Sequence, residues 1–362
     1  MRKIVFLDQC LEGGGAERVL CTIMRALDPR QFEVHLILVT ELRDLRHLVP
    51  DSVAVHELGV TNTRKALPAF SRKIKGLRPD VVFTTTGRTG VLAAMGRLTG
   101  GSYRWIARYP NMPSRQIQSG ALRSWRRTLT QLLFRSADVV IAQSEEMAKE
   151  LFHYFKLKPK KVQTLTNPLD REQIACGLKG ALSPFDPTRQ NWVAAGRLVD
   201  QKGFDVLLKA FAEVHSQHPS ARLHLLGADF CGNRQRLEQQ AESLGIREKV
   251  VFHGFVSNPY PYYKYCDLFI LSSRWEGCPN ALLEALYLGR RAAATRCVPI
   301  IERLVDPAQG TLAKVNDPQS LAQAIREAQS LPETDRTRRT APDSIAEFID
   351  LIESQCATSA TE

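Results

Sequence analysis

The sequence predicts an α/β protein with two doubly wound parallel-sheet domains. Three observations support this prediction: a length of 362 residues, an alternation of short apolar runs with helical patterns, and a break in that alternation near the middle. A chain of this length has room for two domains that each bury a core. Short apolar strands separated by helices are typical of parallel sheets covered on both faces.

The first half of the chain contains seven expected strands, with helical patterns between most of them. Amphipathic stretches at residues 16–27, 90–97 and 145–155 are examples of these helices. The expected strands lie at residues 3–8, 33–39, 53–57, 80–84, 103–107, 139–142 and 161–164. We therefore predict a first domain at residues 1–168.

A second domain follows a break in the pattern. Residues 169–190 contain several glycines and prolines and are predicted to be a linker. Strands are then expected at residues 192–195, 222–226, 249–252, 268–271 and 291–295, and helices at residues 204–215, 234–244, 280–288 and 319–329. This second domain is assigned to residues 191–338. Residues 339–362 are expected to form a C-terminal helix that packs back on the first domain.

Composition excludes several classes of protein. The hydrophobic content of 44% and charged content of 24% are those of a soluble globular chain. No apolar run approaches the roughly 18 residues of a membrane helix, and the first apolar run is too short for a secretory signal. Eight cysteines without a Cys-x-x-Cys pair or a Cys/His cluster favour reduced cytoplasmic thiols and argue against zinc.

The positive charge is concentrated in the first half of the chain. Residues 1–180 hold 29 Lys and Arg against 16 Asp and Glu, whereas the remainder holds 20 against 22. This asymmetry predicts that the first domain meets an anionic partner, either nucleic acid or a membrane surface. Few aromatic residues stand among the basic ones, which argues against nucleic acid.

A glycine-rich turn follows the first strand. Gly14 and Gly15 open the first expected helix, where backbone N–H groups and the helix dipole favour an anion. The pattern is not G-x-G-x-x-G, so dinucleotide binding is weakly supported. A tight turn without a ligand is the alternative.

A pair of cations opens the second domain. Arg197 follows its first strand, and Lys202 precedes its first helix. Both positions face the carboxyl edge of a parallel sheet, where ligands bind. Arg and Lys there can hold a diphosphate, and the alternative is a solvated basic turn.

Two acids flank a helix start in the run E-G-C-P-N-A-L-L-E. Glu276 lies in the loop, Pro279 is expected at the first helical position, and Glu284 projects from the helix. The unpaired amides of this helix start would point at the same edge and belong to Asn280, Ala281 and Leu282. Carboxylates can accept hydrogen bonds from sugar hydroxyls. Glu284 as a plain surface residue is the alternative.

These segments together resemble family 4 glycosyltransferases. The resembling text is E-G-G-G-A-E-R at 12–18, T-N-P-L-D at 166–170, G-R-x4-K-G at 196–203, L-G-I-R-E-K-V-V-F-H-G at 244–254 and S-S-R-W-E-G-C-P-N-A-L-L-E-A at 272–285. The resemblance covers nearly the whole chain. It implies the GT-B fold, in which two Rossmann-like domains face a central cleft, and a retaining transfer of a sugar from a nucleoside diphosphate sugar.

The resemblance also implies roles for individual residues. Arg197 and Lys202 would bind the donor diphosphate and stabilise it as it leaves, and Glu284 would hold the ribose. Glu276, with the amides after Pro279, would hold the transferred sugar, and it is a catalytic candidate together with Arg197 and Lys202. The remaining donor contacts would come from Gly14 and Gly15 of the first domain and from Gly277, Pro279, Asn280, Ala281 and Leu282 of the second.

The first domain would then bind the acceptor, a glycan or lipid-linked saccharide, in the assembly of bacterial surface polysaccharide or lipopolysaccharide. Its charge agrees with peripheral association at the anionic cytoplasmic face of the membrane. Residues 122–135 contain four arginines among Leu and Trp and are a candidate interfacial helix, with a solvated basic helix as the alternative. Arg108 stands where many members carry a His and is a candidate for the acceptor or a phosphate.

The chain departs from the family pattern in three loops, and three alternative functions stay open. Residues 227–229 replace the usual G-x-G, residues 289–291 replace the usual G-x-P, and residues 296–300 lack the usual glycine. No D-x-D motif occurs, so we expect an enzyme that needs neither a metal nor a cofactor. We expect its sugar donor to be UDP-linked. The alternatives are a sugar-nucleotide epimerase, a non-catalytic partner subunit with a degenerate donor site, and a basic nucleic-acid-binding protein.

Overall fold

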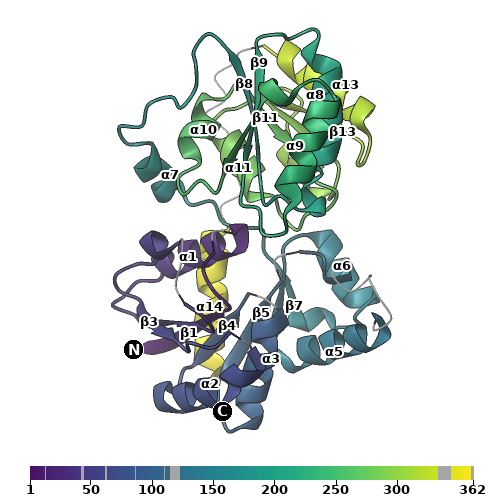
Figure 1. Ribbon diagram of the computed structural model, residues 1–362. Coiled ribbons are helices and arrows are strands. Elements are labelled where there is room, and N and C mark those ends of the chain that lie inside the picture. Colours follow the sequence, from purple (N-terminus) through teal and green to yellow (C-terminus); the bar gives the residue numbers. More distant parts are fainter. Residues whose placement is uncertain are drawn as a thin grey trace. The chain divides into compact units, whose positions relative to one another are not determined.

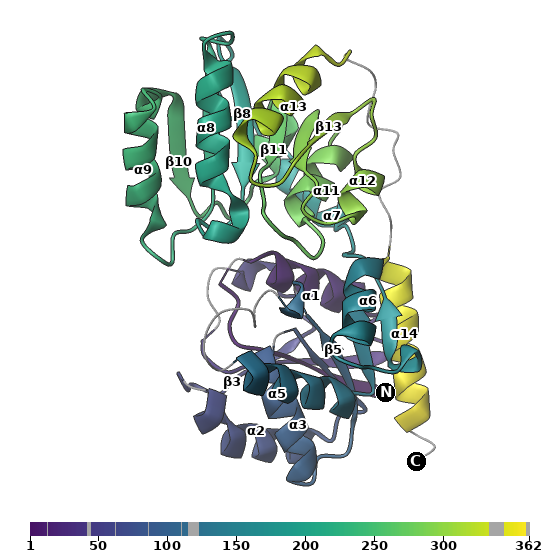
Figure 2. The ribbon, with the colours of Figure 1, turned by 90° about the vertical axis from the view of Figure 1, so that its right-hand side faces the viewer.

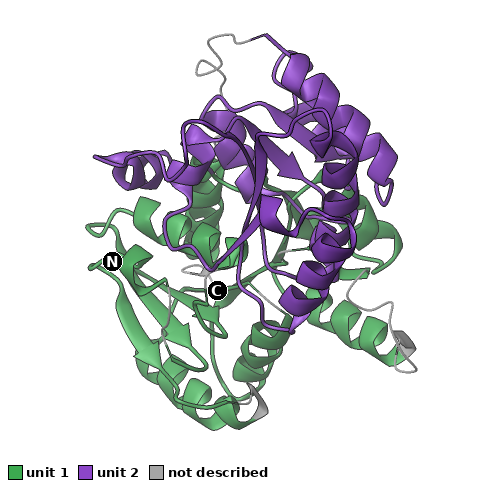
Figure 3. Ribbon diagram, turned by 45° about the horizontal axis from the view of Figure 1, so that its top comes forward, with its two compact units in different colours: residues 1–168, 342–362 green, residues 169–341 purple. Residues whose placement is uncertain are grey.

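The computed structural model describes residues 1–12, 14–41, 45–61, 63–85, 87–109, 111–114, 123–332 and 344–359. The chain divides into two compact units (Figure 3): unit 1 is residues 1–168 with 342–362, and unit 2 is residues 169–341. Each unit contains one parallel sheet with helices around it (Figure 1). The predicted α/β fold with two doubly wound parallel sheets is confirmed.

The sheet of unit 1 has, within the described residues, seven parallel strands in the order β3-β2-β1-β4-β5-β6-β7. Along the chain they are β1 (Arg2–Asp8), β2 (Phe32–Leu38), β3 (Ala54–Glu57), β4 (Val81–Thr84), β5 (Arg104–Arg108), β6 (Val139–Ala142) and β7 (Val162–Thr164). The central strands are almost entirely buried because helices cover both of their faces.

Each face of this sheet has its own hydrophobic core. One core lies beneath α1 (Gly15–Ala26) and α14 (Ile345–Ser359), where Phe348 and Ile352 are fully buried. The other lies beneath α2 (Thr63–Leu77), α3 (Gly87–Leu98), α5 (Arg123–Ser136) and α6 (Glu145–His153). Helix α14, yellow in Figure 2, therefore completes the core of unit 1 although it comes last in the chain.

Unit 2 repeats this plan with six parallel strands among its described residues, in the order β10-β9-β8-β11-β12-β13. They are β8 (Gln190–Ala195), β9 (Ala221–Leu226), β10 (Val250–Gly254), β11 (Leu268–Leu271), β12 (Ala292–Thr295) and β13 (Gly310–Ala313). Helices α8 (Phe204–His215), α9 (Asn233–Ser243) and α13 (Pro318–Ser330) cover one face. The other face carries α7 (Arg171–Leu178), α10 (Tyr260–Tyr265), α11 (Asn280–Tyr287) and α12 (Ile300–Leu304).

The segment at residues 169–190 differs from its prediction as a linker. It carries helix α7, whose first turn is capped by the Asp170 carboxylate accepting a hydrogen bond from Gln173 N at 2.9 Å. Ile174 is buried in the core of unit 2, so this segment is part of the unit. The predicted boundary at residues 338 and 339 lies outside the described residues.

No helix in the described ranges is both long enough and apolar enough to span a bilayer. The eight cysteines all fall within described residues, and none of them forms a disulfide.

Candidate functional site

The loops that follow β8 and β9 touch at two glycines. Gly227 has φ +158°, and a Cβ placed on it would lie 1.8 Å from the carbonyl oxygen of Gly196. Backbone hydrogen bonds from Gly196 N to Leu226 O and from Leu198 N to Ala228 O join the same loops. Only glycine permits this contact, so the carboxyl edge of unit 2 depends on it.

The Lys202 turn packs directly on the loop that follows β11. Gly203 adopts φ +62° as the cap of α8, and a Cβ there would lie 2.2 Å from the carbonyl oxygen of Ser272. The Ser272 hydroxyl donates to Lys202 O at 2.8 Å, and Arg274 N donates to Gln201 O at 2.7 Å. These bonds hold the two predicted motifs together.

Glu276 is the centre of a buried polar network. Its Oε1 accepts hydrogen bonds from Lys202 Nζ and from Ser273 Oγ, both at 2.6 Å, and its Oε2 accepts one from Gln201 Nε2 at 3.3 Å. The residue is only 5% exposed. A buried carboxylate requires such donors because its charge loses water on burial. The structure thus brings together two of the predicted site residues, Lys202 and Glu276.

Arg274, in the same loop as Glu276, helps to hold this arrangement in place. Arg274 donates from Nη1 and Nη2 to the Asp205 carboxylate at 2.9 and 2.7 Å. Burial acts to raise the pKa of Asp205, but the hydrogen bonds and charge of Arg274 outweigh it, so the pKa is lowered. Arg274 Nε donates to Asn316 Oδ1 at 2.7 Å. The two-pronged bond ties the loop after β11 to the first turn of α8.

Helix α11 begins directly after this network. Pro279 is its N-cap, one position before the predicted placement, and the first hydrogen bond inside the helix runs from Leu283 N to Pro279 O at 3.1 Å. The amides that precede this bond belong to Asn280, Ala281 and Leu282, as predicted. Gly277 and Pro279 are buried, and Glu284 is half-buried on the helix.

Arg197 lies in the loop after β8, the strand that pairs with β11. It is exposed, and its side chain makes no hydrogen bond or ion pair with any residue that the structure describes. Its loop and the Glu276 loop leave the same edge of two neighbouring strands. Arg197 is therefore available to a ligand at that edge.

Two of the loops in which this chain departs from the family pattern follow β9 and β12. Asp229 accepts backbone hydrogen bonds from Cys231, Asn233 and Arg234, which lowers its pKa. After β12, burial and then the nearby Glu276 carboxylate raise the pKa of the Cys297 thiol to about 12. The loop after β12 therefore adjoins the Glu276 network without adding a charged thiolate to it.

The glycine-rich turn belongs to unit 1. Gly14 is the N-cap of α1 and Gly15 its first residue, while Gly13 lies outside the described residues. A Cβ on Gly14 would lie 2.1 Å from Glu17 Oε2. The carboxylate of Glu17 therefore covers the helix start at which the sequence predicts an anion.

Asp8 is a candidate residue that sequence reasoning missed. It ends β1, is 2% exposed, and accepts hydrogen bonds from Thr85 Oγ1 and from Gln9 N. Burial, followed by the charge of Glu17, raises the pKa of Asp8 to about 7. A carboxyl group that titrates near neutrality at the carboxyl edge of a sheet is typical of functional sites. The only signal in the sequence is a polar residue at the end of an apolar strand.

Arg108 lies inside unit 1 and not on its surface. It ends β5, is 1% exposed, and donates from Nη2 to Asn167 Oδ1 at 2.6 Å. Its positive charge also opposes the rise in the pKa of Asp8. The structure therefore places Arg108 among buried polar groups, where it acts on Asp8.

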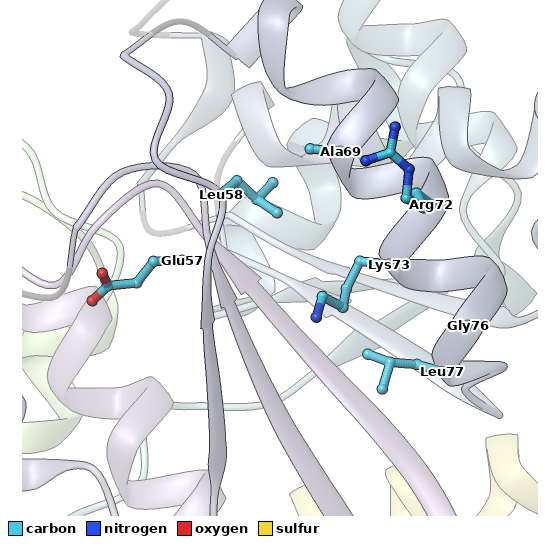
Figure 4. A pocket seen from close by; sticks show the side chains of 7 residues that line it. All are labelled: Glu57, Leu58, Ala69, Arg72, Lys73, Gly76 and Leu77. Atoms are coloured by element: carbon cyan, nitrogen blue, oxygen red, sulfur yellow. The ribbon is translucent and has the colours of Figure 1, made fainter.

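A hollow of about 470 Å³ lies in unit 1 between α2 and the end of β3 (Figure 4). Leu58, Ala69 and Leu77 form an apolar part of its lining, and Arg72 and Lys73 add positive charge. It contains none of the residues predicted for the site.

Two family models match the chain. The model described as Glycosyltransferase Family 4 matches residues 13–173, and the model described as Glycosyl transferases group 1 matches residues 183–341. The first match lies largely in unit 1, and the second falls entirely in unit 2 and includes the Lys202 and Glu276 network.

Similar proteins agree with these matches. The chain is 27% identical over 352 residues to the N-acetylgalactosamine-N,N'-diacetylbacillosaminyl-diphospho-undecaprenol 4-alpha-N-acetylgalactosaminyltransferase of Campylobacter jejuni, covering 94% of this chain and 92% of that one. It is 23% identical to the lipopolysaccharide core biosynthesis glycosyltransferase LpsE of Rhizobium meliloti, with 87% and 85% covered. The crystal structure of Anabaena HepE in complex with UDP and glucose superposes with a TM-score of 0.76 at 20% identity, covering 99% of this chain and 97% of that one.

The fold and the two matching family models together define a glycosyltransferase. The chain belongs to the family 4 glycosyltransferases, which have the GT-B fold.

Proposed function

We propose that this enzyme transfers a sugar from a UDP-linked donor to a glycan or lipid-linked acceptor in bacterial surface polysaccharide or lipopolysaccharide assembly. The direct contact between Lys202 and Glu276 carries the proposal. A diphosphate and its sugar share one anomeric bond, so a cation for the former and an acid for the latter must lie a few ångströms apart. The names of the Campylobacter jejuni and Rhizobium meliloti relatives support the acceptor class.

The proposed chemistry assigns each group at this edge a role. Lys202 and Arg197 neutralise the departing diphosphate, and the amides at the start of α11 add fixed dipoles. Glu276 accepts hydrogen bonds from the sugar, and Glu284 accepts them from the ribose. Cleavage of the anomeric bond builds negative charge on the diphosphate, so these cations stabilise the transition state more than the ground state.

Two finer parts of the proposal concern stereochemistry and metal. We expect retention of the anomeric configuration, which the coupling constant of the product's anomeric proton reports. We also expect no metal requirement, because Lys202 and Arg197 supply the charge that a metal would supply. Turnover that survives excess EDTA supports this, and turnover restored only by Mg²⁺ or Mn²⁺ contradicts it.

For the acceptor side, we propose that α5 docks on the anionic cytoplasmic face of the membrane. Trp125 and Leu132 are each 58% exposed, and their spacing of seven residues puts them on one side of the helix. Arg126 and Arg135 are exposed beside them, whereas Arg127 donates to Tyr154 O at 2.9 Å. Exposed apolar groups flanked by cations are typical of interfacial helices.

Vesicle sedimentation tests this docking. The doubly substituted Trp125→Ser, Leu132→Ser protein should lose most of its binding to phosphatidylglycerol vesicles, while Leu182→Ser, another exposed leucine but in unit 2, should not. Equal binding by the unchanged protein, the doubly substituted protein and the Leu182→Ser protein contradicts the proposal.

A screen of nucleotide sugars against lipid-linked acceptors tests the central function. We expect release of UDP, from one or a few donors, that depends on the acceptor. A product formed from the donor alone identifies an epimerase instead. No binding of any nucleotide by calorimetry identifies a non-catalytic subunit.

A further inference from the structure

The Glu276 carboxylate is supported by two kinds of donor. Lys202 is a charged donor, and it is also the group proposed for the diphosphate. Ser273 and Gln201 are neutral donors that bind Glu276 without cancelling its charge. The proposed function assigns a role to the charged donor only.

Both neutral donors are themselves held in place. The carbonyl oxygen of Ser273 accepts a hydrogen bond from Thr295 Oγ1, the last residue of β12, at 2.6 Å. Gln201 Nε2 also donates to Trp275 O at 2.9 Å. Ser273 and Gln201 are both buried, so their donor groups stay aimed at the carboxylate.

The two parts of a nucleotide sugar make opposite demands on Lys202. A diphosphate attracts Lys202 and so weakens its hold on Glu276. The sugar requires Glu276 to stay correctly oriented, because only an oriented carboxylate accepts hydroxyl hydrogen bonds with good geometry. A buried carboxylate whose cation is shared with a ligand needs other donors to stay in place.

We propose that Ser273 and Gln201 are positioning residues that hold Glu276 for the sugar while Lys202 turns to the diphosphate. This inference rests on the proposed function and deepens it. It predicts that the two residues affect recognition of the sugar and not recognition of the nucleotide.

Calorimetry with two probes separates these effects. We use UDP and whichever of UDP-glucose and UDP-N-acetylgalactosamine the unchanged protein binds more tightly. Ser273→Ala and Gln201→Met should each leave the Kd for UDP within about twofold and raise the Kd for the nucleotide sugar about tenfold, the usual effect of losing a hydrogen bond to a charged group. Ser216→Ala, an exposed serine on the same unit, should change neither value.

A double substitution tests whether the effect passes through Glu276. In a Glu276→Gln background, Ser273→Ala should add less than about twofold to the Kd for the nucleotide sugar, because the charge it holds is already gone. Thermal melts of every variant verify folding.

The outcomes separate this inference from the function on which it rests. Equal loss of UDP and nucleotide-sugar affinity, or a full extra effect in the Glu276→Gln background, overturns the positioning role and leaves the proposed function intact. Failure of the unchanged protein to bind any of the three nucleotides overturns both.

Discussion

The two units bury an acid at the same edge of the same kind of sheet but stabilise it differently. In unit 2, the Glu276 carboxylate contacts the ammonium group of Lys202. In unit 1, the Asp8 carboxyl contacts the neutral Thr85 hydroxyl and a backbone amide, with the like charge of Glu17 nearby. Burial therefore raises the pKa of Asp8 to about 7.

The difference shows that the same fold can carry two kinds of acidic group at the carboxyl edge of its sheet. A carboxylate bonded to a cation suits a site for charged ligands, because the pair can exchange partners with a diphosphate and a sugar. A carboxyl group without a bonded cation can instead hold a proton near neutral pH. The predictions below either break or sharpen this contrast.

The largest effect should follow from removing the cation of unit 2. Lys202→Ala should lower turnover at least about 100-fold, because the leaving diphosphate loses its bonded charge. Acceptor-dependent UDP release measures this, and circular dichroism checks the fold. Lys209→Ala, an exposed lysine on α8, should leave turnover unchanged. Undiminished release by the Lys202 variant contradicts the assignment.

Gly227 of unit 2 should matter far more for stability than Gly14 of unit 1. Gly227→Ala should lower the free energy of unfolding by about 2–4 kcal/mol, because its Cβ meets backbone at φ +158°. Gly14→Ala should cost under about 1 kcal/mol, because its φ is −78° and its Cβ meets only the movable Glu17 side chain. Urea denaturation compares the two, and similar costs would contradict this account.

The free energy of unfolding should depend on pH through the raised pKa of the Asp8 carboxyl group. The unfolded carboxyl loses its proton near pH 3.8, whereas the folded one keeps it to about 7. Its stabilising contribution is therefore complete below pH 3.8 and is lost as the pH rises through 7.

The free energy of unfolding, measured from pH 4 to 8, should thus fall less with rising pH for Asp8→Asn than for the unchanged protein. Asp51→Asn, an exposed acid of the same unit, serves as the control. A constant difference between Asp8→Asn and the unchanged protein contradicts the prediction.

A smaller effect on the pH dependence of stability should come from the histidines. Two histidine pairs occupy matching places in the two sheets. His35 on β2 contacts His56 on β3, and His224 on β9 contacts His253 on β10, with ring nitrogens 3.0 Å apart in both pairs. The second nitrogen differs: His35 meets the Glu33 carboxylate, and His224 meets the neutral Asn191 amide.

Burial, then the charges of His253 and Arg222, lower the pKa of His224 from 6.5 to about 4. Folded His224 stays neutral where the unfolded residue gains a proton, so its contribution is complete above pH 6.5 and is lost as the pH falls toward 4. His224→Gln should remove this slope in urea denaturation between pH 4 and 6.5, and His47→Gln, an exposed control, should retain it. An unchanged slope in His224→Gln contradicts the assignment.

Most of the strands could be predicted from the sequence, because their signal is local. The expected strands at residues 139–142 and 268–271 match β6 and β11 residue for residue, and the others agree within two residues. Strand β13 and helices α10 and α12 were missed. Each has at most six residues, too few for periodicity to separate strand, helix and loop. Helix α10 also contains Pro261 among tyrosines, which are poor helix formers.

The members of the candidate site were named from the sequence, but the contacts between them could not be. Lys202 and Glu276 are 74 residues apart, and they meet because their loops follow strands β8 and β11, which pair side by side. The roles of Ser273 and Gln201 depend on that meeting. Asp8 was missed for the same reason, since its partner Thr85 is 77 residues away and its burial needs the complete sheet.

The sequence by itself determined the alternating elements, the basic first half, the family, and the presence of cations and acids in the loops at the carboxyl edge of unit 2. Each of these depends on residue type and short spacing alone. The tertiary structure decided which charges meet, which are neutralised and which acid keeps its proton. Those outcomes depend on distance and on the loss of water around a group, and both arise only when remote strands pair.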